Sequence, residues 1–588
     1  MSKSKSATTT EAKAKPSPLR MPIELTRRLA TWILLHPSQA LVVACIVAIP
    51  VAPIVVVLLA LRMQQSSDEK PPTLADALAA LDRRDDREAE FIVRSLDDSG
   101  PLPAEELGGK PFVLGVVADR RAARLLDRAR QRHEVLAVEY LQQARALGFP
   151  PGREGEGLRL LGKNLFLSGQ TSASLPVLQQ ALPLDRSHQK ELHRLLAGAY
   201  LAEPQPKFDE ALVHIRQYLA AKDLSSDERE QALLERGRIE LGLKQFDACR
   251  RTLEEIPKNS KHQAEAMLLA GRLTSEQALA LPIAAESDAQ RQSALKQAIE
   301  TLRGVPTRNT PPPIAAASEF MIGRCEQGLG DDRAALAEFD QAASRYLETE
   351  AGIAAGLDAA ELLRRENRNA ESLERYRTVL GSLDGAQPYK NPWIGPDDLR
   401  TRTLNAYQQF VKAKQFELAI ELAELLTPLF GAERSLQLSA EAHRQWGRQL
   451  LAQPHRAPSQ VAELEDQAWR KLREAGRLYA QLAETRRAAR EYPDDLYDAA
   501  ESYLAGHDFT KAAAAFRRYL AAESRRRRPR ALIGLGEALL AEGLPKQALV
   551  PLEECIEFHA SDAAVFEARL LASQAKLEMG DGKAAEAL

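Results

Sequence analysis

The sequence predicts an all-α fold, in which one transmembrane helix precedes a solenoid of repeated helical hairpins, each of about 35 residues. Ala, Leu, Glu, Arg and Gln dominate the composition, and these residues lose little side-chain freedom in a helix. Alternating runs of Val, Ile and Thr are almost absent after residue 62, so we expect little β-sheet. A chain of 588 residues exceeds the usual size of one compact core, which favours several domains or a repeat array.

Residues 1–39 are predicted to form a disordered basic tail and a pre-membrane segment on the cytoplasmic side. Residues 1–20 are rich in Ser, Thr, Lys and Ala and contain almost nothing to bury. Further along, Arg27 and Arg28 precede Trp32, an aromatic residue suited to the headgroup boundary of a membrane.

Residues 40–62 are predicted to form a transmembrane helix. From Ala40 to Leu61 there is no charged side chain, and about 20 residues at about 1.5 Å each span a hydrocarbon core of about 30 Å. Pro50 and Pro53 would kink this helix without preventing it from spanning the bilayer. An uncleaved anchor is favoured over a buried core helix, and over a signal peptide, which would have a shorter apolar core and a small-x-small cleavage site.

The charges on either side of this span predict its orientation. Only Arg62 and Lys70 closely follow the span, beside Asp68 and Glu69. The basic residues that precede it are Lys3, Lys5, Lys13, Lys15, Arg20, Arg27 and Arg28. Because basic residues tend to stay in the cytoplasm, we expect a single-pass inner-membrane protein with a cytoplasmic N-terminus and, in a bacterium, a periplasmic repeat domain.

A linker over residues 63–73 leads into helical segments with an internal repeat. From Gly323 as origin, Gly330 lies 7 residues on, Ala335 lies 12 residues on and Phe339 lies 16 residues on. The same steps start again at Gly162, Ala500 and Gly536, and in weaker form at Gly237 and Tyr407. Neighbouring origins lie about 35 residues apart where no insertion intervenes, which is a period typical of helical-hairpin repeats.

This spacing has a physical cause. Two helices of about 13 residues need a small residue where their backbones approach, and large residues fill the groove beside it. A glycine seven residues after the small residue ends the first helix in a left-handed conformation. One hairpin cannot bury its apolar face alone, so neighbouring hairpins must stack.

The repeat divides the chain into two predicted arrays. Residues 74–388 form the first, and residues 399–588 form the second, which apparently ends inside a repeat. The loop between them, residues 389–398, reads YKNPWIGPDD and contains prolines and aromatic residues. A hairpin stack that stops inside a repeat is expected to expose an apolar edge, which suggests either a truncated product or a partner that covers this end.

These residues resemble the tetratricopeptide-repeat family. The tryptophan that the family carries early in the first helix is generally missing, and Glu326 occupies a position that is usually large and apolar. A generic solenoid of helical hairpins remains the alternative. The resemblance is strongest over residues 155–187, 315–346, 493–524 and 529–560.

The resemblance implies a concave groove, lined by the first helices of successive hairpins, that binds peptides or proteins. Basic groove residues loosely resemble the clamps with which some family members hold a terminal carboxylate, but the asparagines and lysines of that clamp are not reproduced. The implied groove residues form a basic area and a more mixed one: Arg159, Lys163, Phe166 and Arg194, then Tyr497, Glu501, Ile533 and Glu537.

No catalytic residue, cofactor site or metal site is predicted, because HExxH, GxSxG and Walker motifs are absent from the sequence. His188, Glu191 and His193 are the only local cluster of possible metal ligands, and a solvated surface is the better interpretation of it. The cysteines are far apart in sequence and are expected to be buried free thiols: Cys45, Cys249, Cys325 and Cys555.

These observations predict a non-catalytic, membrane-anchored scaffold or adaptor that binds other proteins or peptides, in envelope assembly, secretion or quality control. The net charge of −3 argues against nucleic acid as a partner. Two alternatives stay open. One is the scaffold part of an enzyme whose catalytic domain lies beyond residue 588, and the other is a structural protein that forms homo-oligomers.

Overall fold

The computed structural model describes residues 73–96, 103, 106–282, 285–306, 310–383, 389–453, 458–523 and 525–587. Throughout these ranges the regular elements are helices, so the predicted all-α fold is confirmed. None of these helices is both long and apolar enough to cross a bilayer. The transmembrane helix predicted at residues 40–62 lies outside the described ranges, and its orientation and membrane location stay predictions.

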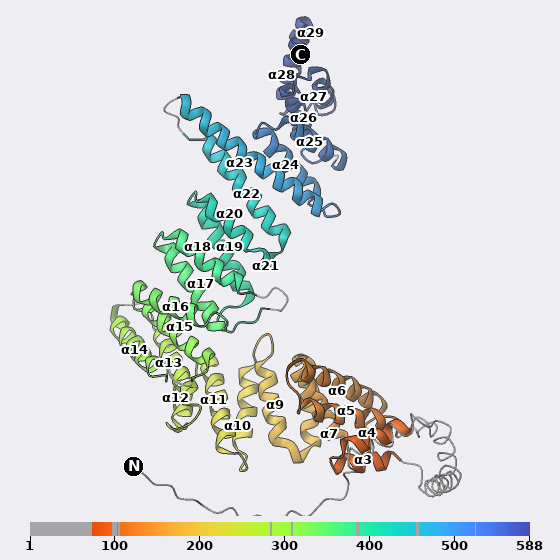
Figure 1. Ribbon diagram of the computed structural model, residues 1–588, viewed down its shortest axis with the longest axis vertical. Coiled ribbons are helices and arrows are strands. Elements are labelled where there is room, and N and C mark those ends of the chain that lie inside the picture. The colour runs from red at the N-terminus through yellow and green to blue at the C-terminus, as the bar shows by residue number, and fades with distance from the viewer. Residues whose placement is uncertain are drawn as a thin grey trace, which may run out of the picture. The chain divides into compact units, whose positions relative to one another are not determined.

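The chain divides into two compact units between Pro204 and Gln205, inside the EPQPK segment. Successive helices of the first unit pack against their neighbours in sequence. Its described elements are α3 (Leu74–Asp82), α4 (Asp86–Ser95), α5 (Gly109–Ala122), α6 (Asp127–Leu147), α7 (Glu154–Leu167), α8 (Thr171–Leu184), η3 (Arg186–His188) and α9 (Gln189–Leu201) (Figure 1).

In the second unit most helices likewise pack on the next helix in sequence, and α18 packs on α20 (Figure 1). Its first half contains α10 (Phe208–Leu219), α11 (Ser226–Gly242), α12 (Phe246–Glu254), α13 (Gln263–Leu279), α14 (Ala285–Arg303), α15 (Pro312–Gly328), α16 (Asp332–Arg345), α17 (Glu350–Arg365) and α18 (Asn369–Gly381). Its second half contains α19 (Pro396–Lys412), α20 (Phe416–Leu425), α21 (Thr427–Phe430), α22 (Ala432–Leu451), α23 (Pro458–Thr485), α24 (Tyr492–Ala505), α25 (Phe509–Ala522), α26 (Arg528–Ala541), α27 (Pro545–Phe558), α28 (Val565–Glu578) and α29 (Gly582–Glu586).

The loop predicted to separate two arrays, residues 389–398, lies within the second unit. The Trp393 ring meets the Phe320 ring edge-on, with 5.3 Å between their centroids, and the Arg272 guanidinium lies 5.3 Å from the centroid of Trp393. Ile394 is buried in the core of this unit. The loop is therefore part of the packing, and the division between compact units falls elsewhere, at Pro204.

The hairpins close as the repeat spacing predicts. A Cβ on Gly323 would lie 2.5 Å from the ring of Phe339, so only glycine allows α15 and α16 to approach this closely. Seven residues later Gly330 has φ of +83° and ends α15. In other turns too, the residue seven positions after a small or tightly packed residue has a positive φ. These residues are Gly169, Lys244, Asn367, Lys414, His507, Gly543 and Gly580.

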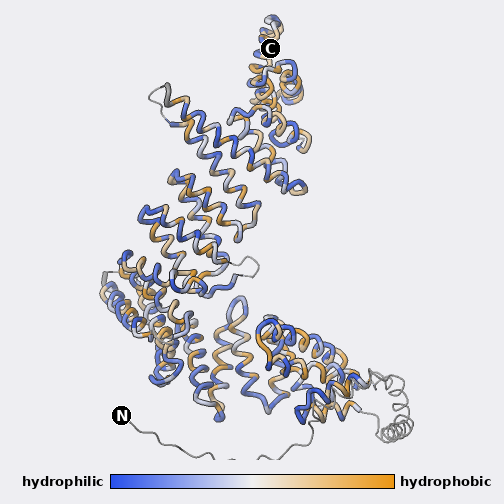
Figure 2. Tube along the Cα trace, viewed as in Figure 1, coloured by the Kyte–Doolittle hydropathy of each residue, from blue (hydrophilic) through white to orange (hydrophobic). Residues whose placement is uncertain are grey.

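The core follows the contacts between neighbouring helices. Phe339 and Phe516 come from second helices of hairpins and are fully buried against the first helices. Figure 2 shows hydrophobic and hydrophilic residues alternating along the helices, as expected of helices with one buried face. Cys249, Cys325 and Cys555 are buried free thiols, as predicted, and Cys45 lies outside the described ranges.

Candidate functional site

The basic groove residues predicted in the first unit are held by carboxylates. Arg159 on α7 is 7% exposed, and its Nε lies 2.8 Å from Asp185 Oδ2 while its Nη1 lies 2.7 Å from Glu191 Oε2. Lys163, one helical turn further along α7, lies 2.9 Å from Asp119 on α5. These charges are compensated inside the unit, so they do not form an open cationic surface.

The other two predicted residues of this area are Phe166 and Arg194. Phe166 at the end of α7 packs over Gly198 on α9, where a Cβ would lie 3.2 Å from the Phe166 ring. Arg194 is exposed on α9. The structure thus brings Arg159 and Lys163 onto one helix face but gives both of them internal partners.

Two members of the local histidine cluster, His188 and Glu191, belong to the same network. His188 Nδ1 lies 2.8 Å from Asp185 Oδ1, and Glu191 accepts from Arg159. Among the residues that the structure describes, no group of three or more His, Cys, Asp or Glu side chains is arranged to hold a metal ion. The contacts of His188 and Glu191 are therefore those of structural residues.

Asp185 has a strongly perturbed acidity. Burial opposes its ionisation, but hydrogen bonds from His188, Arg159 and Ser187 outweigh that effect and lower the pKa of Asp185 to about 2. Because this pKa lies below the ordinary value of 3.8, the folded state gains stability from ionised Asp185 above about pH 4 and loses it as the pH falls toward 2.

We expect Asp185→Asn to lower the stability of the first unit by about 2 kcal/mol at pH 7, and by progressively less as the pH falls from 5 to 3. Hydrogen exchange of peptides from α7 to α9 in the intact chain measures this difference. Asp82→Asn is the control, because Asp82 is exposed and pairs with Arg153 at the surface. A difference between wild type and Asp185→Asn that does not change with pH would contradict this assignment.

The mixed area predicted in the second unit is largely interior. Tyr497 on α24 and Ile533 on α26 are 5% and 4% exposed. Glu501 is partly buried beside Tyr497, and burial together with Glu501 raises the pKa of Tyr497. Glu537 reaches the surface on α26, but partial desolvation by its neighbours and the nearby Glu567 raise its pKa. Only the two carboxylates of this predicted set reach the surface.

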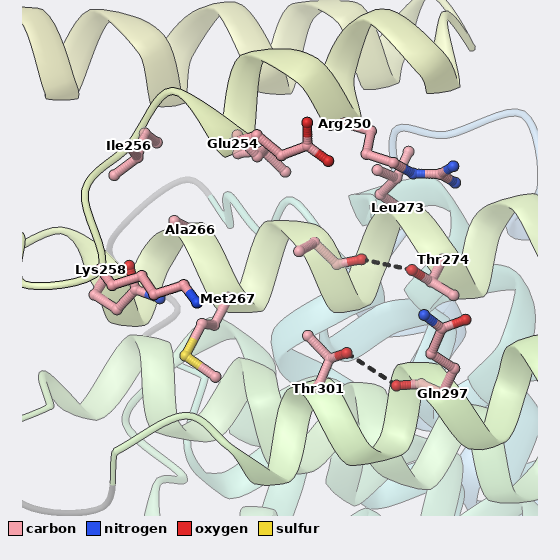
Figure 3. Close-up of a pocket in the computed structure, with 13 residues that line it drawn as sticks. Arg250, Glu254, Ile256, Lys258, Ala266, Met267, Leu273, Thr274, Gln297 and Thr301 are labelled. Atoms are coloured by element: carbon pink, nitrogen blue, oxygen red, sulfur yellow. Dashed lines mark hydrogen bonds between the residues drawn. The ribbon is translucent and has the colours of Figure 1, made fainter.

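A groove that the sequence did not predict runs along α13 in the second unit. It encloses a pocket of about 400 Å³ between α12 and α14, with α13 as its floor (Figure 3). A second pocket of about 490 Å³ continues it and shares Arg250, Thr274 and Gln297 with the first. This size is in the range of ligand-binding sites in proteins.

The groove exists because α12 is short. α12 spans only Phe246–Glu254, whereas the second helices α16 and α25 each have 14 residues. Pro257 follows soon after its end, and a proline disfavours helical backbone in the residue before it. The missing turns of α12 leave the outer face of α13 uncovered.

The floor of the groove is apolar and its rim is polar. Ala266 and Leu273 are buried at the floor, and Met267 and Ala270 beside them are partly exposed. The remaining lining residues are Arg250, Leu253, Glu254, Ile256, Lys258, Gln263, Thr274, Gln297 and Thr301. An apolar floor with a polar rim is the arrangement that binds an amphipathic segment of a polypeptide.

Comparisons with known proteins add little to this geometry. No family model matches the chain, and no curated protein matches it in sequence. A solved structure described as Naa15/Naa10 bound to HypK-THB matches with 12% sequence identity and a TM-score of 0.28, over 87% of this chain and 67% of that chain. A likeness of this degree carries no argument about fold or function.

Proposed function

We propose that this protein is a non-catalytic scaffold that binds a segment of another polypeptide in the groove along α13. The observation that carries this proposal is the groove itself, in which α12, α13 and α14 surround an apolar floor that no other described part of the chain covers. Stacked helical hairpins, of the tetratricopeptide-repeat type in this proposal, supply a stable frame for such a surface.

The three cysteines in the described ranges support a non-catalytic role. Burial raises the pKa of the Cys249 thiol to about 12 and that of the Cys325 thiol to about 11. Burial also raises the pKa of Cys555. A nucleophilic cysteine needs an accessible thiolate near neutral pH, and these three thiols are protonated and enclosed.

We expect Ala270→Arg to weaken peptide binding strongly, because the long charged side chain would fill the middle of the apolar floor. The probes are peptides enriched from a random display library on the intact chain. Their affinity should fall at least tenfold in Ala270→Arg, which corresponds to about 1.4 kcal/mol.

Ala514→Arg provides the matched control, since Ala514 is exposed on α25, far along the chain from the groove. It should bind the same peptides with unchanged affinity, and both variants should keep the thermal unfolding of the wild type. Peptides that bind both variants equally well would place the binding surface outside the groove.

A further inference from the structure

The groove wall formed by α12 and by the turn that follows it carries charges of alternating sign. Arg250 and Glu254 lie one helical turn apart on α12, and Lys258 follows in the turn after Pro257 (Figure 3). All three are exposed, and Arg250 donates to the neutral amide of Gln277 at 2.9 Å. In the described ranges none of the three forms an ion pair, so their charges are available to a partner.

The opposite wall, from α14, is uncharged. The residues it contributes to the two pockets are Gln290, Ser293, Ala294, Gln297 and Thr301. A bound segment therefore meets charge on one flank and neutral polar groups on the other. This asymmetry fixes which flank of the occupant must be charged.

The two threonine hydroxyl groups of the groove are already used by their own helices. Thr274 Oγ1 donates to the Ala270 carbonyl at 3.0 Å, and Thr301 Oγ1 donates to the Gln297 carbonyl at 2.9 Å (Figure 3). An extended segment would need partners for its backbone N–H and C=O groups, and an unpaired buried group is costly. A helix satisfies its own backbone, so these walls favour a helical occupant.

The floor also suits a helix. α13 has 17 residues and is therefore about 25 Å long, enough for a partner helix of four to five turns. Ala266, Ala270 and Thr274 stand four residues apart along this floor, so small side chains recur at each turn. Small residues let the backbone of a second helix approach closely, while Met267 and Leu273 provide apolar contacts beside them.

We propose that the occupant of the groove is an amphipathic α-helix that carries acidic, basic and acidic residues at positions i, i+4 and i+8 on one flank. These residues face Lys258, Glu254 and Arg250 in turn. The sequence of signs reads the same in both directions, so it holds whether the partner helix runs parallel or antiparallel to α13. This inference rests on the proposed function and names the class of polypeptide that it binds.

The test uses three fluorescein-labelled 20-residue peptides with the same apolar face and the same net charge. The first carries Glu, Lys and Glu at i, i+4 and i+8, the second carries Lys, Glu and Lys there, and the third is the first with a central proline that prevents a helix. Fluorescence anisotropy with the intact chain should show the first peptide binding at least tenfold more tightly than either of the others.

A charge-reversed wall provides the decisive control. In the triple variant Arg250→Glu, Glu254→Lys and Lys258→Glu, all three substitutions are at exposed positions, and the preference should invert in favour of the Lys-Glu-Lys peptide. Equal binding of the first two peptides, no inversion, or no binding of any peptide would overturn the inference. If the proline peptide binds as well as the first and Ala270→Arg blocks it, the helix is wrong while the groove function stands.

Discussion

Phe516→Ala is expected to destabilise the packing of α24, α25 and α26 by about 3–5 kcal/mol. Phe516 is 1% exposed, and a Cβ on Gly534 would lie only 2.4 Å from its ring, so the ring fills the contact between α25 and α26 completely. It also meets the Tyr497 ring edge-on, with 6.1 Å between centroids. Truncation removes these contacts and leaves a cavity that two rigid helices cannot close.

Hydrogen exchange of peptides from α24 to α26 in the intact chain measures this loss locally, which suits an array in which neighbouring hairpins stabilise one another. Phe558→Ala is the matched control, because Phe558 ends α27 with 70% of its surface exposed. It should change the local stability by less than about 0.5 kcal/mol. Similar losses in the two variants would contradict the hairpin packing described here.

Arg402→Ala is expected to cost about 3–5 kcal/mol, because it leaves two carboxylates without their shared partner. Arg402 Nη2 lies 2.5 Å from Asp358 Oδ1, and its Nε lies 2.6 Å from Glu361 Oε1. Burial already raises the pKa of Asp358, and Arg402 opposes that rise by stabilising the ionised form. Without the guanidinium, buried Asp358 would keep only its longer pair with Arg324 Nη1 at 3.7 Å, and Glu361 would lose the hydrogen bond from Arg402.

The same helix offers a control two residues away. The Arg400 side chain is 48% exposed, and it pairs at 3.2 Å with Asp397, whose side chain is 95% exposed. Arg400→Ala should therefore cost no more than about 1 kcal/mol. Local exchange of peptides from α17 and α19 separates the two outcomes, and equal costs at the two positions would contradict a structural role for the Arg402 network.

Much of the fold was predictable because its repeat has a local signature. Gly323, Gly330 and Phe339 show at fixed intervals where two helices touch, where the first one ends and what fills the space between them. The same turn without glycine is harder to see. Lys244 and His507 adopt positive φ at the equivalent position, although most residues avoid that conformation.

The predicted groove residues were less informative, because a helical register places a side chain on a face but does not reveal what meets it. Arg159 lies on α7 as expected, yet Asp185 and Glu191 come from later in the chain and neutralise it. Tyr497 and Ile533 likewise turn out to be core residues, because the adjoining hairpins cover them.

The groove along α13 escaped prediction for a different reason. It depends on three helices spread between residues 246 and 303, and on the early end of one of them. A signal was present: Ile256 and Pro257 interrupt the second helix of a hairpin, and Ala266, Ala270 and Thr274 then recur at intervals of four. Small residues at this interval give a helix face without large side chains. Whether that face is left uncovered depends on where the neighbouring helices lie, which the sequence alone does not show.

The most direct test of a peptide-binding scaffold is hydrogen–deuterium exchange of the intact chain with and without a saturating library-selected peptide. The groove predicts that added protection is confined to peptides from α12, α13 and α14, with the largest change around Ala270 on the floor. Protection that maps to α24 and α26, or no protection anywhere despite binding, would contradict the assignment of the groove as the site where this scaffold holds its partner.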